Sequence, residues 1–135
     1  MDIEILKIAS DTKNHKVLHK CTHKAKQKNS MCGDEMEVSV KVGKDQIIDF
    51  GYQCKSCIFC QASASLLAKA AKNKSIKNIE TFHKLLITSF QNDKLKLPVQ
   101  WMIFKKLARK KYYARKECIE LPFKALSKAI KDYND

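Results

Sequence analysis

The sequence lacks any apolar run that approaches the roughly 18 residues needed to cross a bilayer as a helix. Its start also lacks a basic segment and a small-residue cleavage site, and it carries Asp2 and Glu4, so we expect no secretory signal. No internal repeat or long linker interrupts the chain, which predicts a single domain over residues 1–135. We therefore expect a cytoplasmic protein with no membrane partner.

Acidic side chains are scarce: 14 Asp and Glu stand against 27 Lys and Arg, for a net charge of +13. This balance favours an acidic or anionic partner. The lysines are spread along the chain, however, and no platform of basic and aromatic side chains stands out apart from residues 110–113. We interpret the charge mainly as a solvated face and do not expect nucleic acid as the partner.

Alternation of apolar and polar residues predicts a β-hairpin in the first half of the chain. Met36, Val38, Val40 and Val42 alternate with polar residues, and residues 43–45 have turn composition. The alternation resumes over residues 48–52. The preceding residues 11–30 are polar and rich in lysine, and we interpret their three histidines, four residues apart, as solvated and without a common role. These histidines are His15, His19 and His23.

Helical patterns dominate the second half, and a short helix is also expected within the first dozen residues. An Ala-rich segment follows Cys60, a second helix can be capped by Ser75, and a third follows Pro98. The last helix must start close to Cys118 if Pro122 is to lie in its first turn. Strands followed by helices predict an α+β fold, in which a small antiparallel sheet of about three strands packs against C-terminal helices.

Six cysteines are available for chemistry. Stable disulfides are rare in a reducing compartment, so metal binding or thiol chemistry is the better explanation. Gly33 would let the backbone turn and bring Cys32 and Asp34 towards one point. Cys57 precedes the Ala-rich helix, and Cys118 starts the last helix, where the helix dipole lowers the pKa of a thiol. Three thiols and one carboxylate could form a tetrahedral site for zinc or an iron–sulfur species.

A second arrangement of the thiols stays open at this point. Cys54, Cys57 and Cys60 form C-x2-C-x2-C, which is similar to the first three ligands of a bacterial ferredoxin. The pattern does not continue to a fourth cysteine, so Cys32 or Cys118 would have to complete the site. Such a protein would carry a stable cluster and serve in electron transfer or regulation.

Three ordered segments resemble the U-type iron–sulfur scaffold family, which comprises IscU, SufU and the N-terminal domain of NifU. Residues 29–34 resemble its N-P-x-C-G-D motif, and residues 57–65 resemble its G-C-x-I-S-x-A-S-A-S segment. Residues 114–126 resemble its A-R-x-x-C-x-x-L-x-W-x-A-L segment. The long interval between Cys57 and Cys118, and the arginine before Cys118, are closer to the SufU branch than to IscU.

The resemblance implies a scaffold or sulfur acceptor rather than a true enzyme. Its ligands for a transient [2Fe–2S] cluster or zinc would be Cys32, Asp34, Cys57 and Cys118. A cysteine desulfurase would deliver persulfide sulfur to one of the three cysteines, and apo-proteins or carrier proteins would receive clusters. The net positive charge then predicts an acidic docking surface on these partners. This chain departs from the family pattern at three side chains that could add ligands, which are Cys54, Cys60 and Glu117.

Overall fold

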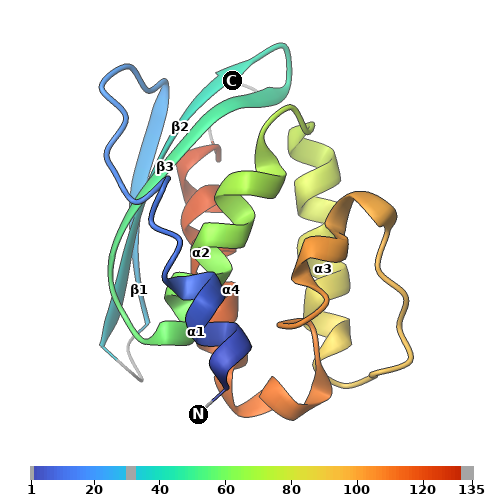
Figure 1. The fold of residues 1–135 in the computed structure, drawn as a ribbon. Coiled ribbons are helices and arrows are strands. Elements are labelled where there is room, and N and C mark those ends of the chain that lie inside the picture. The colour runs from blue at the N-terminus through green and yellow to red at the C-terminus, as the bar shows by residue number, and fades with distance from the viewer. Residues whose placement is uncertain (1, 30–32, 132–135) are drawn as a thin grey trace.

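A three-stranded antiparallel sheet occupies the N-terminal half of the computed structural model, which describes residues 2–29 and 33–131 (Figure 1). The strands lie side by side in the order β1 (His23–Asn29), β2 (Asp34–Gly43) and β3 (Gln46–Lys55). The apolar side chains of β2 alternate as expected, and Met36, Val38 and Val40 are fully buried against the helices. The predicted α+β fold is confirmed.

The turn between β2 and β3 sets which side chains of β3 face the core. Lys44 and Asp45 both adopt positive φ angles, 52° and 63°, as the favoured two-residue hairpin turns require. The pairing register then shifts between Lys41 and Val42. Because of this irregularity Ile47 is buried, whereas Ile48 is 48% exposed. The hairpin prediction is correct, but the alternation that was expected to resume over residues 48–52 does not include Ile48 on its buried side.

Strand β1 is a feature that the sequence pattern did not reveal. It pairs along its whole length with β2, from His23 opposite Val40 to Asn29 opposite Asp34. Its side chains are almost all polar, so they carry no apolar alternation. The histidines expected to be solvated do not share a helical face, because His15 lies beside Tyr52 in a parallel bridge and His23 begins β1.

The helices lie together on one side of the sheet, and two of the longer ones pack directly against the strands (Figure 1). This layer comprises α1 (Ile3–Ala9), α2 (Ile58–Ala71), α3 (Ile76–Ser89), the 3₁₀ helices η1 (Val99–Phe104) and η2 (Lys110–Arg115), and α4 (Lys116–Ala129). Ser75 caps α3 as predicted, since its side chain accepts a hydrogen bond from the backbone N–H of Asn78. No helix in the described part of the chain has the length and apolar character required to cross a membrane.

Two expectations about the C-terminal helices are corrected. The segment after Pro98 forms a 3₁₀ helix rather than an α-helix, with Trp101 stacked on Phe82 at 4.2 Å between ring centroids. Helix α4 begins at Lys116, so Pro122 lies inside it and not in its first turn. The proline removes the backbone N–H that would bond to the carbonyl of Cys118. Ser63 of α2 donates a hydrogen bond to the next carbonyl, that of Ile119, at 2.6 Å.

Candidate metal centre

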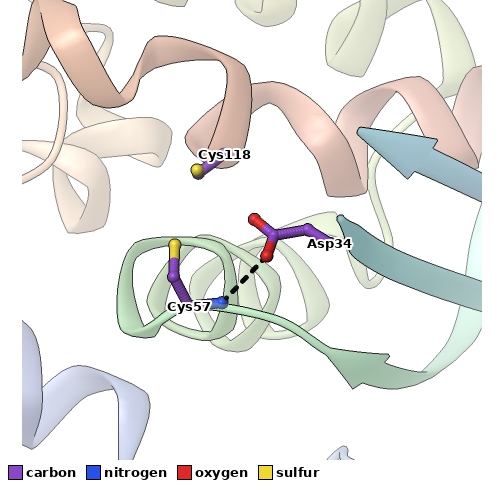
Figure 2. Close-up of side chains that lie close together, drawn as sticks. All are labelled: Asp34, Cys57 and Cys118. Carbon is purple, nitrogen blue, oxygen red and sulfur yellow. Dashed lines mark hydrogen bonds between the residues drawn. The ribbon is translucent and has the colours of Figure 1, made fainter. Parts of the chain in front are cut away.

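Three side chains from separate elements converge at one end of the helical layer. Asp34 is the first residue of β2, Cys57 is the N-cap residue of α2, and Cys118 lies in the first turn of α4. One carboxylate oxygen and the two sulfur atoms all lie within 4.8 Å of one another. Figure 2 shows both thiols and the carboxylate pointing towards a common centre.

Local backbone geometry orients the first two of these residues. Gly33, directly before Asp34, has a φ of +72°, which lies in the left-handed region that favours glycine. Cys57 has extended backbone angles, φ −70° and ψ 166°, as expected of a residue that precedes the first turn of a helix. Its own side chain makes no capping hydrogen bond, so the thiol is available for other contacts.

The carboxylate of Asp34 is only half satisfied by the protein. Its Oδ1 atom accepts a hydrogen bond from the backbone N–H of Cys57 at 3.3 Å (Figure 2). Its Oδ2 atom is buried and has no hydrogen-bond partner within residues 2–29 and 33–131. An unsatisfied buried carboxylate oxygen is costly, and a cation is one of the few groups that would compensate it. The donor set of one oxygen and two sulfurs matches the ligands that zinc and iron–sulfur species accept.

Burial controls the chemistry of the Cys118 thiol. Its side chain is only 2% exposed, and this desolvation raises the pKa of Cys118 above its ordinary value. The nearby Cys57 thiol and Asp34 carboxylate raise it further. The expectation that the helix N-terminus lowers this pKa is therefore wrong for the metal-free protein. A bound metal cation would reverse the balance, because coordination holds a thiol in its thiolate form.

The other predicted ligands are not part of this group of three among the described residues. Cys32 falls outside the described residues, so its placement stays a prediction. Cys60 is completely buried in the first turn of α2, and burial raises the pKa of its thiol. The carboxylate of Glu117 forms an ion pair with Lys124 at 3.2 Å and has 43% of its side chain exposed. Neither Cys60 nor Glu117 belongs to the group of three among the described residues.

Cys54, also outside the group of three, has a neighbour that sequence reasoning did not foresee. Its sulfur lies 3.7 Å from Nε2 of His15, and the two residues line the same cavity, of about 440 Å³. The His15 ring also meets the edge of Tyr52, with 5.0 Å between centroids. No local pattern could have revealed this pair, since it depends on residues 14–16 running beside β3.

Comparisons with known proteins agree with this architecture. The family model described as the NifU-like N terminal domain matches residues 2–135. The zinc-dependent sulfurtransferase SufU of Bacillus subtilis (strain 168) is 27% identical over 103 residues, which cover 76% of this chain and 70% of that protein.

Two solved structures share the fold. The N-terminal part of a nitrogen-fixing NifU-like protein from Brucella abortus superposes with a TM-score of 0.87 at 20% identity, covering 96% of this chain and 91% of that one. FiSufU of the SUF system from Fervidobacterium islandicum AW-1 gives 0.82 at 20% identity, covering 96% of each chain.

Proposed function

The chain belongs to the NifU-like N-terminal domain family, and on this premise we propose that it is an iron–sulfur cluster assembly scaffold and sulfur acceptor. Its site would comprise Cys32, Asp34, Cys57 and Cys118. The observation that carries the proposal is the convergence of Asp34, Cys57 and Cys118 within 4.8 Å, with one buried carboxylate oxygen unsatisfied. Iron and nascent clusters would be the cargo of this site, and zinc is the alternative occupant.

The sulfur donor would be a cysteine desulfurase, and the recipients would be apo-proteins or carrier proteins. In the transfer step a thiolate of this chain attacks the terminal sulfur of the donor's persulfide. A new S–S bond forms, and the donor's cysteine leaves as a thiolate. Exposure favours Cys57 over Cys118 as the acceptor, because Cys57 is partly exposed whereas Cys118 is 2% exposed. The name of the B. subtilis relative, a sulfurtransferase, supports a relay of this kind.

We further propose that residues 1–135 act as one domain, that the chain relays sulfur without catalysing turnover on its own, and that it works in the cytoplasm. The family match over residues 2–135 supports the first point. The proposed chemistry of the site supports this location, since free thiols that must receive sulfur are maintained in reducing compartments.

Metal content of protein purified without oxygen tests the site. Cys57→Ser and Cys118→Ser should each lose most of the bound zinc or iron, because each removes one of the thiolate ligands. Cys21→Ser is the matched control, since Cys21 is a partly exposed free thiol outside the group of three. Undiminished metal in both site variants would contradict the proposal, as would an equal loss in the control.

The alternative, a stable cluster on Cys54, Cys57, Cys60 and a further cysteine, makes the opposite prediction. Under it Cys54→Ser abolishes the cluster and Asp34→Ala has no effect. The structure gives less support to this alternative, because the thiols of Cys54 and Cys60 lie outside the group that Asp34, Cys57 and Cys118 form in the described part of the chain.

A further inference from the structure

The connection between α3 and α4 concentrates the positive charge of the protein. Residues 94–116 contain no Asp or Glu, although they hold nine of the 27 Lys and Arg residues. These are Lys94, Lys96, Lys105, Lys106, Arg109, Lys110, Lys111, Arg115 and Lys116. Figure 1 shows much of this connection on the flank of the helical layer away from the sheet. The positive charge is therefore concentrated in this segment as well as spread along the rest of the chain.

A groove of about 760 Å³ lies within this basic connection. Its apolar lining includes Leu95, Leu97 and Met102. Its basic lining includes Lys96, Lys105 and Arg109, and none of these three makes an ion pair with any described residue. The groove thus combines apolar surface with uncompensated positive charge.

The two acidic side chains at the groove, Glu4 and Asp93, already bind other groups of the protein. Glu4 forms an ion pair with Lys106 at 2.8 Å. The carboxylate of Asp93 accepts a hydrogen bond from the backbone N–H of Lys110 at 2.7 Å. Lys96, Lys105 and Arg109 make no ion pair with either carboxylate, so an acidic ligand would find these charges available.

Part of the apolar surface at the groove is held on a fixed support, the short helix η1. Val99 is 89% exposed and Met102 is 43% exposed, both on η1. The same short helix is anchored by Trp101, which stacks on Phe82 and donates a hydrogen bond to Asn78 at 2.8 Å. The exposed side chain of Met102 is thus presented in one arrangement, which favours a preformed docking surface.

We propose that this groove binds an acidic segment of a partner protein that inserts an apolar side chain against Leu95, Leu97 and Met102. The proposal goes beyond the sulfur-transfer function, since it uses none of the cysteines. Nucleic acid fits the groove less well, because binding of single strands relies on exposed aromatic rings. Trp101 is 1% exposed, and none of the described residues that line the groove is aromatic.

Fluorescence anisotropy with three labelled probes of equal length tests the proposal. The probes are a glutamate-rich peptide with leucines, the same peptide with serine in place of leucine, and an oligothymidine strand. The leucine peptide should bind about tenfold more tightly than the serine peptide, because burial of one leucine contributes at least about 1.4 kcal/mol. Its affinity should also fall as salt is added.

Matched variants locate the binding. Lys105→Glu with Arg109→Glu should weaken the leucine peptide about tenfold or more, whereas Lys24→Glu with Lys41→Glu, the same charge change on the sheet, should have a smaller effect. Met102→Ser should remove most of the difference between the two peptides. Amide chemical shifts should move at Leu95, Met102 and neighbouring residues, and circular dichroism would verify that each variant is folded.

Several results would overturn the proposal. Equal affinity for the leucine and serine peptides would show that charge alone drives binding. Tighter binding of oligothymidine at the same residues would assign the surface to nucleic acid. Equal weakening by the groove and sheet variants, or no binding of either peptide, would also refute it. None of these results would bear on metal binding at Asp34, Cys57 and Cys118.

Discussion

Replacement of Asp34 by asparagine should separate the stability of the metal-free protein from its capacity to hold a metal. Asparagine preserves the size of the side chain and an oxygen that can accept from the backbone N–H of Cys57, now 3.3 Å from Oδ1. It removes the buried negative charge, whose second oxygen has no hydrogen-bond partner in the described part of the protein. The metal-free variant should therefore be as stable as the parent or more so.

The magnitudes follow from the two roles of the carboxylate. Burying an unpaired charge costs more than burying a neutral amide, whose NH2 can also donate to the neighbouring sulfur atoms, so Asp34→Asn should raise the free energy of unfolding of the metal-free protein by up to about 2 kcal/mol. A neutral amide is a poorer ligand for zinc than a carboxylate. If zinc affinity falls tenfold, the stabilisation by zinc at a hundred times the original Kd drops from about 2.7 to about 1.4 kcal/mol.

Urea denaturation with and without zinc measures both effects. The difference in unfolding free energy between the two conditions reports metal binding, and the value in chelator reports the apoprotein. Ser39→Ala is the control, because Ser39 is buried and its hydroxyl accepts from the backbone N–H of Leu18 at 3.1 Å, away from the thiols. It should destabilise both forms equally, by about 1–3 kcal/mol.

Two outcomes would refute the reasoning. If Asp34→Asn destabilises the metal-free protein by as much as Ser39→Ala, the carboxylate stabilises the fold, and its unsatisfied oxygen does not lower the unfolding free energy. If zinc stabilises the variant as much as the parent, Asp34 is not a ligand.

Two further predictions concern the core. Burial raises the pKa of the Cys60 thiol above its ordinary value of 9.0, so the thiol of the unfolded chain loses its proton at a lower pH than the thiol of the folded protein. The contribution of Cys60 to stability is therefore complete below pH 9.0. Above pH 9.0 it declines, by at most about 1.4 kcal/mol per pH unit. Urea denaturation of the metal-free protein on both sides of pH 9.0 measures the unfolding free energy as a function of pH. This free energy should decline less steeply with pH in Cys60→Ala than in the parent, and an equal slope in both proteins would contradict the prediction. Gly51→Ala should lower the unfolding free energy by about 1–3 kcal/mol, because a Cβ there would lie 2.5 Å from the carbonyl oxygen of Lys16; a thermal midpoint equal to that of the parent would show that the segment around Lys16 moves aside freely.

The elements with strong periodic patterns were predictable, and those without them were not. The hairpin follows from alternating residues such as Val38 and Val40, and the cap of α3 follows from Ser75. Strand β1 has a polar sequence and is a strand because β2 offers its hydrogen-bonding edge. The position of Pro122 inside α4 could not be predicted from the sequence either. The tertiary packing of the whole helix outweighs the one backbone hydrogen bond that the proline removes.

For the site, the sequence by itself determined the chemical groups and the places where they begin or end an element. Asp34 follows a glycine at the start of a strand, and Cys57 directly precedes a helix, so local rules were enough to indicate them. Only the tertiary structure brought Cys118 to the same point, because the packing of α4 against α2 and the sheet joins residues far apart in the chain. The raised pKa of Cys118 also depends on the tertiary structure. Desolvation of the thiol comes from every element packed around the side chain and not from its own helix terminus alone.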